Sequence, residues 1–163
     1  MSAQGGKEPA RRGSSNPIGA MRAIDTNILV YAEIKSMSQH KRARLLLTEL
    51  AQGTEPWAIP WPCIYEFLRV VSHPKIFHPP MPMAVARADL DQIFHSPTLV
   101  LLAETERHTS ILDRLLEKSG ASGNLVHDAH IAALCLEHGV SELLTADRDF
   151  ARFPEMRTMN PFA

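Results

Sequence analysis

The sequence has few cysteines, no excess of one sign of charge and no long apolar run, and each shortage excludes a class of protein. Its two cysteines, Cys63 and Cys135, lie far apart and have no metal-binding spacing, so they favour a reducing compartment over a disulfide framework. The formal net charge is -1, which gives no overall field for nucleic-acid binding. No apolar run reaches the roughly 18 residues of a membrane span, and no signal-peptide core precedes Met21. We expect a cytoplasmic protein without a membrane segment.

The length and composition are those of one ordinary folded domain with an added N-terminal segment. The chain has 163 residues, of which 45% are hydrophobic and 21% charged, enough for one sizeable core. Residues 1–20 are rich in Gly, Ser, Ala, Pro and Arg and have almost no large apolar side chains. We therefore expect a flexible extension over 1–20 and a folded domain over 21–163. The sequence leaves open whether the extension is native or Met21 is the initiator.

Short apolar runs alternate with helical patterns through the rest of the chain. Helical spacing predicts helices just after Asn27 and over 39–51, 62–72, 83–94, 105–120 and 125–137, with Ser38 and Asn124 as candidate N-caps. Apolar runs predict strands that end at Asp25 or cover 57–59, 98–103, 141–145 and 157–159. Strands that alternate with helices predict an α/β fold, a three-layer α/β/α sandwich around a parallel sheet.

Four carboxylates occupy positions where an ordinary surface acid is not expected. Asp25 follows the first strand and Asp147 the fourth, while Glu66 and Asp128 fall on the apolar stripes of two helices. Because an inward-facing charge is costly without compensation, we expect something to neutralise them. Asp25 taken alone fits a helix cap as well as a site residue.

The predicted fold brings these acids to one rim of the sheet, since ligands bind at the carboxyl ends of parallel strands. Four carboxylates there would repel one another and raise one another's pKa, a conflict that Mg²⁺ or Mn²⁺ removes. Such a centre suits hydrolysis of a phosphodiester by metal-activated water. Four neighbouring side chains are candidates to orient the ligands through hydrogen bonds: Thr26, Asn27, Asn124 and Thr145.

Other readings of these residues stay open. Asp25 also fits the nucleophile of a phosphotransferase or phosphatase, although Asn27 stands where such enzymes usually have a second acid. The acids also fit a non-catalytic interaction protein with a structural metal. His127 and His130 lie three apart on one predicted helix, but no third metal ligand is evident from the sequence. Basic residues at 40–44 fit a solvated helix face or a contact with an RNA backbone.

The acidic segments resemble the motifs of PIN-domain ribonucleases, and most of all the VapC toxins of VapBC toxin–antitoxin modules. The similar segments are Ile24–Tyr31, Glu66, Asn124–Ala133 and Leu144–Phe150. Each is weak alone, but the four in this order within a chain of this size make a strong match. The resemblance covers residues 21 to about 162.

The resemblance implies a function and a set of site residues. Asp25, Glu66, Asp128 and Asp147 match the acids that hold Mg²⁺ or Mn²⁺ in the family, and Asp149 matches a further acid of some members. Thr145 matches a hydroxyl that fixes the site. Family members are endoribonucleases that cut RNA, usually form homodimers and are silenced by a cognate VapB-type antitoxin. The expected fold is the PIN-like α/β/α sandwich.

Overall fold

The computed structural model describes residues 20–163, and a parallel sheet forms the centre of this part of the chain. The N-terminal extension predicted for 1–20 lies outside the described residues, apart from Ala20. The five strands of the sheet are β1 (Arg22–Ile24), β2 (Trp57–Pro60), β3 (Leu99–Leu102), β4 (Glu142–Leu144) and β5 (Thr158–Met159). They follow the order β3-β2-β1-β4-β5, and every pairing is parallel.

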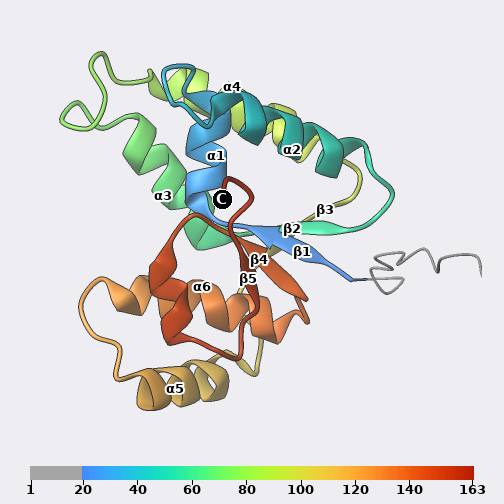
Figure 1. Cartoon of the computed structure of the whole chain (residues 1–163), viewed down its shortest axis with the longest axis vertical. Helices are drawn as coiled ribbons and strands as arrows, with labels where there is room; N and C mark the ends of the chain where they lie inside the picture. The colour runs from blue at the N-terminus through green and yellow to red at the C-terminus, as the bar shows by residue number, and fades with distance from the viewer. Residues whose placement is uncertain (1–19) are drawn as a thin grey trace, which may run out of the picture.

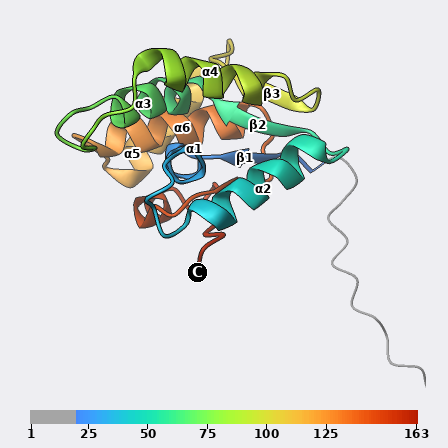
Figure 2. The same cartoon turned by 90° about the horizontal axis from the view of Figure 1, so that it is seen from above.

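The helices lie on both faces of this sheet, which confirms the predicted three-layer α/β/α fold. They are α1 (Thr26–Glu33), α2 (His40–Gln52), α3 (Trp61–Val71), α4 (Met83–Phe94), α5 (His108–Ser119), α6 (Leu125–Glu137) and the 3₁₀ helix η1 (Arg148–Arg152). Helices α1 to α4 lie on one side of the sheet, and α5 and α6 lie on the other (Figure 1). Seen from above, α1 lies between α2 and α3, against which it packs (Figure 2). None of the helices in residues 20–163 is long and apolar enough to cross a membrane.

The core surrounds β1, the middle strand of the five-stranded sheet. Ala23 and Ile24 have no exposed surface, as expected for a strand covered by helices on both faces. Helix α6 contributes the apolar run Ile131–Cys135, which is buried throughout. The end of β1, where Asp25 follows, is therefore surrounded by packed side chains.

Of the two predicted helix caps, Ser38 is wrong, and Asn124 takes the N-cap position of α6 without a capping hydrogen bond from its side chain. Helix α2 has Gln39 as its N-cap, and Ser38 donates its hydroxyl to the Gln39 side chain instead of capping the helix. Asn124 precedes α6 as predicted, but its side chain makes no capping hydrogen bond. A side-chain cap requires an extended backbone at the cap residue, whereas Gln39 and Asn124 both have helical φ and ψ angles.

The register of β1 against β4 places the candidate site. Ile24 is paired with Leu144, and the Asp25 N–H donates to the Leu144 carbonyl over 3.0 Å. Asp25 and Thr145 therefore leave the sheet side by side, at the carboxyl edge where α/β proteins bind their ligands.

Candidate acidic active site

Asp25 is the most buried acid of the site, with 5% of its surface exposed. Its Oδ1 accepts the Thr26 N–H over 2.7 Å and so caps α1. Its Oδ2 accepts the Thr145 hydroxyl over 2.7 Å and the Asn27 amide over 3.0 Å. Asp25 is therefore a helix cap and a member of the polar site at once, and these bonds fix the direction of its carboxylate.

Three other acids share one cavity with Asp25. Glu66 comes from the second turn of α3, Asp128 from the first turn of α6, and Asp147 follows β4 as the cap of η1. Together with Asp25 they line a cavity of about 230 Å³. The predicted convergence of acids from four segments is thus present in the structure.

The prediction that Glu66 and Asp128 face the core is correct only in part. Both are partly exposed, and 42% of the Glu66 side chain is accessible to solvent. The reason is that their helices begin at the carboxyl edge of the sheet, where the inner face of a helix borders the cavity rather than the packed core. Carboxylates in such positions are accessible to an ion and to a substrate.

Hydrogen bonds join the acids through the polar residues between them. The Thr145 hydroxyl donates to Asp25 and accepts the Asp147 N–H over 3.0 Å. The Thr26 hydroxyl donates to Glu66 Oε2 over 3.2 Å. Thr26, Asn27 and Thr145 therefore occupy the orienting positions expected from the sequence.

Asn124 does not join this network. Its side chain is exposed, and among the described residues it makes no hydrogen bond to any acid of the site. Asn27 makes the additional contacts instead, since its amide nitrogen also donates to the Thr145 hydroxyl over 3.2 Å and its amide oxygen accepts the Ala146 N–H over 3.1 Å. The loop after β4 is thus tied to α1 by one asparagine.

Burial and the neighbouring carboxylates raise the pKa of two acids of the site, Asp128 and Asp25. Burial, with the charges of Asp147 and Asp25 next in size, raises the pKa of Asp128 to about 7. Burial also raises the pKa of Asp25, although the hydrogen bonds from Thr145 and Thr26 oppose the increase. The sequence led us to expect this conflict between like charges.

The donor set fits a hard divalent cation. Carboxylate oxygens of Asp128, Asp147 and Asp149 lie within 4.8 Å of one another, so the three can share an ion after small side-chain movements. Protein cations do little to neutralise these acids. Among the described residues, only Arg69 forms an ion pair with an acid of the site, over 3.7 Å to Glu66, and both side chains are partly in solvent. An all-oxygen set suits Mg²⁺ or Mn²⁺.

Sequence reasoning missed some members of the site. The Cys63 thiol lies 3.6 Å from Asp25 Oδ1, with hydrogen-bonding geometry. Tyr31 and Val70 line the cavity, and the Tyr31 ring is held by an edge contact with Phe162, with 5.3 Å between the ring centroids. Nothing in the local sequence pattern separates these residues from ordinary core positions, because their roles depend on contacts between distant segments.

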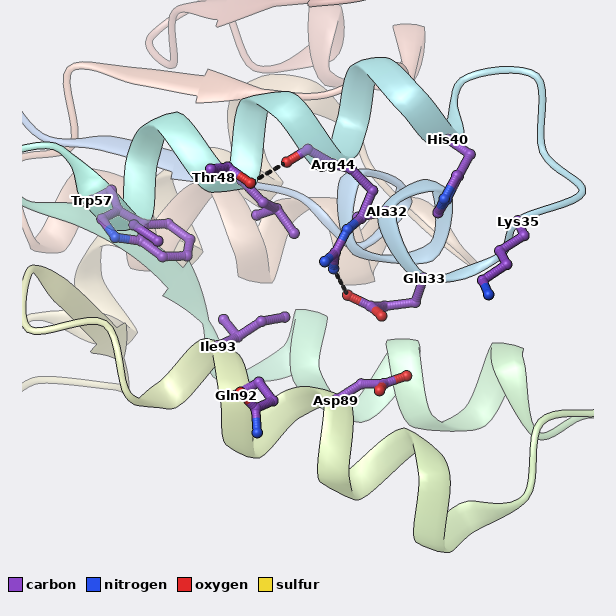
Figure 3. Close-up of a pocket in the computed structure, with 12 residues that line it drawn as sticks. Ala32, Glu33, Lys35, His40, Arg44, Thr48, Trp57, Asp89, Gln92 and Ile93 are labelled. Atoms are coloured by element: carbon purple, nitrogen blue, oxygen red, sulfur yellow. Dashed lines mark hydrogen bonds and ion pairs between the residues drawn. The ribbon is translucent and has the colours of Figure 1, made fainter.

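Two of the basic residues at 40–44, Arg42 and Arg44, bind other parts of the same chain. Arg42 donates to the carbonyls of Pro161 and Phe162 over 2.8 and 2.9 Å, and Arg44 pairs with Glu33 over 3.1 Å. Arg44 lies on a separate cavity of about 410 Å³ between α2 and α4, in which the ion pair is visible (Figure 3). These contacts favour a structural role for the two arginines over contact with an RNA backbone.

The fold and the site together define an α/β/α protein with an acidic centre at the carboxyl edge of its sheet. The PIN domain family model matches residues 23–156. A VapC ribonuclease of Mycobacterium bovis is 36% identical over 141 residues, which cover 86% of this chain and 95% of that protein. Ribonuclease VapC37 of Mycobacterium tuberculosis is 33% identical over 141 residues, which cover 86% and 97% of the two chains.

Solved structures agree on the fold. A chain of the VapBC2 structure from Rickettsia felis, bound to a promoter DNA fragment, has a TM-score of 0.62 at 24% identity, and the match covers 86% of this chain and 98% of that one. A chain of the FitAcB structure from Neisseria gonorrhoeae has a TM-score of 0.62 at 18% identity, with 87% and 99% covered. The chain therefore belongs to the PIN-domain family, among the VapC ribonucleases.

Proposed function

We propose that the protein is the endoribonuclease toxin of a type II toxin–antitoxin module and hydrolyses RNA phosphodiester bonds with Mg²⁺ or Mn²⁺. The observation that carries the proposal is the convergence of Asp25, Glu66, Asp128 and Asp147 on one cavity. Its relatives among the VapC ribonucleases support RNA as the substrate. A divalent ion at these acids supplies Lewis-acid activation of water and neutralises charge that develops on the phosphate.

Each residue of the site has a separate part in this proposal. Asp25 is the buried acid whose position is fixed, because both of its oxygens accept hydrogen bonds. Asp128 and Asp147 present partly exposed oxygens to the cavity, with Asp149 beside them as a further ligand. The Thr26 hydroxyl orients Glu66. The chain thus positions metal and substrate, and the arrangement of its carboxylates is set before either of them binds.

The partners follow from the same assignment. The structures of similar fold include VapBC complexes, which supports a VapB-type antitoxin as the protein partner. A homodimer and action in the cytoplasm, where RNA and antitoxin are both available, complete the proposal. The two cysteines are free and buried, in keeping with a reducing compartment.

The geometry disfavours the phosphotransferase alternative. A nucleophilic aspartate needs an oxygen that can reach the phosphorus atom, but the oxygens of Asp25 accept bonds from Thr26, Thr145 and Asn27. Asp25 is also almost fully buried. A phosphorylated Asp25, trapped after incubation with a phosphate donor, would revive that alternative.

The direct test is cleavage of a labelled RNA mixture by the purified chain with Mg²⁺, with Mn²⁺ and with chelator. We expect cleavage with either ion and none with chelator. Asp25→Asn and Glu66→Gln should each reduce the rate by about 100-fold or more, whereas Asp113→Asn, an exposed acid on α5, should cut like wild type. If Asp25→Asn and Glu66→Gln cut as fast as wild type, the nuclease centre does not lie here.

A further inference from the structure

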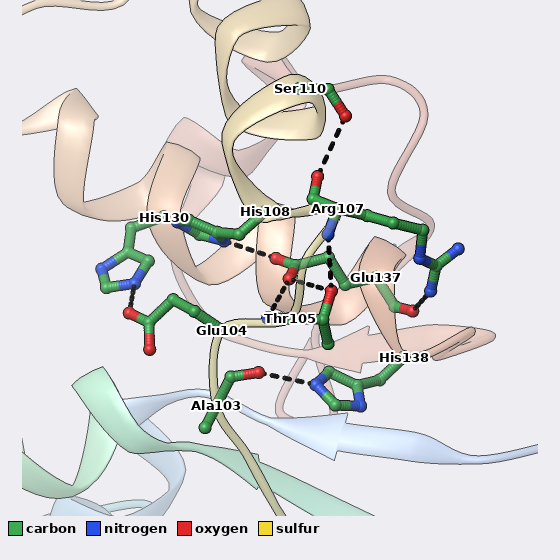
Figure 4. A network of polar contacts seen from close by, with 9 residues as sticks. All are labelled: Ala103, Glu104, Thr105, Arg107, His108, Ser110, His130, Glu137 and His138. Atoms are coloured by element: carbon green, nitrogen blue, oxygen red, sulfur yellow. Dashed lines mark hydrogen bonds and ion pairs between the residues drawn. The ribbon is translucent and has the colours of Figure 1, made fainter.

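A second group of metal-ligating side chains lies beside the acidic site. Glu104 follows β3, His108 is the first residue of α5, and His130 lies on α6. One potential ligand atom of each lies within 4.8 Å of those of the other two. The His130 Nε2 is 2.7 Å from Glu104 Oε1, and the two imidazole rings meet edge to face at 5.2 Å (Figure 4).

Glu137 orients one of these histidines from behind. Its side chain has no exposed surface, and its Oε2 lies 2.5 Å from His108 Nδ1. Its other oxygen accepts the Thr105 N–H and hydroxyl over 2.8 and 2.9 Å. The Glu137 carboxylate is thus fixed by Thr105 and placed to accept a hydrogen bond from Nδ1 of His108.

This arrangement leaves the remaining nitrogen of His108 ready to bind a cation. A metal-bound histidine typically donates its other ring N–H to a carboxylate, which fixes the tautomer and raises the basicity of the ligand nitrogen. Glu137 already occupies that position. A simple surface ion pair has no need of a fully buried carboxylate behind it, held by two further hydrogen bonds.

The donor set and its access both suit zinc. Two imidazoles and one carboxylate match sites in which Zn²⁺ keeps one position for water. Zinc ligands stand about 2.0–2.2 Å from the ion, and ligand atoms that lie within 4.8 Å of one another can reach such positions through small side-chain movements. Glu104 and His130 also line a neighbouring cavity of about 580 Å³, and 53% and 30% of their side-chain surfaces are exposed. An ion therefore has a path into the cluster.

We infer that Glu104, His108 and His130 form a Zn²⁺ site that is separate from the acidic centre. The site joins the end of β3, the start of α5 and the first half of α6. It uses no residue of the acidic centre and does not depend on which substrate that centre cuts. The His127–His130 spacing seen in the sequence is not the relevant pair, because His130 turns to Glu104 and His108, and His127 is exposed outside the cluster.

The test is a calorimetric titration of the full chain with Zn²⁺. The protein is first treated with chelator, and excess Mg²⁺ is then present throughout the titration. Wild type should bind one equivalent that Glu104→Gln and His108→Gln weaken by at least about tenfold, since even outer-shell losses cost that much. His127→Gln is the matched control on the same helix and should bind like wild type. Because Glu104 is exposed, its variant is expected to fold, which circular dichroism checks.

X-ray absorption at the zinc edge identifies the ligands independently. Imidazole scattering from two histidines is expected in wild type and should weaken in His108→Gln, whereas zinc at the acidic centre would show oxygen ligands alone. Zinc should also raise the melting temperature of wild type more than that of Glu104→Gln. Unchanged affinity in both variants, or a zinc spectrum without imidazole, would overturn the assignment.

Discussion

At the scale of single residues, the site depends on one hydroxyl. The Thr145 oxygen donates to Asp25 and accepts the Asp147 N–H, and it also accepts the Asn27 amide. Only 2% of Thr145 is exposed, so water cannot replace these bonds. Two acids from distant parts of the chain thus have their relative positions set by the same atom.

Thr145→Val removes this hydroxyl and keeps the shape of the side chain. We expect RNA cleavage or Mn²⁺ affinity to fall by about 10- to 100-fold, the usual cost of losing an orienting partner at a metal centre. Thr145→Ser keeps the hydroxyl and should stay close to wild type. The two variants are compared by steady-state RNA cleavage and by Mn²⁺ titration. Equal activity of the Val and Ser variants would show that the hydroxyl does not orient the site.

At the scale of elements, α6 serves the core and the site together. Its apolar run packs the helix into the molecule, and this packing holds Asp128 near the other acids. The dipole at the start of the helix favours the charged form of Asp128 slightly. Burial and the surrounding carboxylates have the larger effect, because the pKa is raised to about 7. The position of Asp128 therefore favours metal binding and lowers the stability of the metal-free fold.

This conflict predicts the pH dependence of metal-free stability. Asp128 binds its proton more tightly in the folded chain, where its pKa is about 7, than at the ordinary value of 3.8. Its contribution to stability is therefore present below the ordinary value and is lost as pH rises through about 7. In chelator, Asp128→Asn should lack this loss and melt higher than wild type at pH 8, while it cuts RNA poorly.

Thermal melts of wild type and Asp128→Asn from pH 5 to pH 8 measure this effect. Asp113→Asn, on the exposed face of α5, is the control and should follow the wild-type curve. Excess Mn²⁺ should raise the wild-type melting temperature at pH 8 more than that of Asp128→Asn. A wild-type curve that is no steeper than that of Asp128→Asn would mean that the acids do not strain the metal-free fold.

At the scale of the whole molecule, the strand order creates the site. Asp25 and Thr145 are 120 residues apart, yet β1 and β4 are neighbours in the sheet and end together. Helices α3 and α6, which lie on opposite sides of that sheet (Figure 1), then bring their acids to the same edge. The acidic centre is thus a property of the complete fold and is expected to disappear when the fold unfolds.

The same scale explains what the sequence could and could not predict. Alternating helices and strands, each read over a local window, predict a parallel sheet and hence the rim where Asp25 and Asp147 meet. The helix over 83–94 and the helix over 125–137 agree with α4 and α6 to the residue. Local periodicity also places Glu66 on the correct helix but cannot tell that its inner face borders a cavity.

Contacts between distant segments escaped prediction for a physical reason. The Cys63 thiol near Asp25 and the Glu104–His108–His130 cluster depend on side-chain directions after packing. Spacing along the chain carries no information on these directions when the partners come from different elements. The N-cap of α2 is Gln39 rather than Ser38, and Asn124 caps α6 by position only, because the backbone at Gln39 and Asn124 is already helical.

The most direct measurement of the central claim is anomalous X-ray diffraction from crystals of the protein grown with Mn²⁺. We predict a manganese peak in the cavity lined by Asp25, Glu66, Asp128 and Asp147, in direct contact with carboxylate oxygens of at least two of them. If the protein cleaves RNA with Mn²⁺ but its manganese peak lies elsewhere and that cavity is empty, this prediction is contradicted.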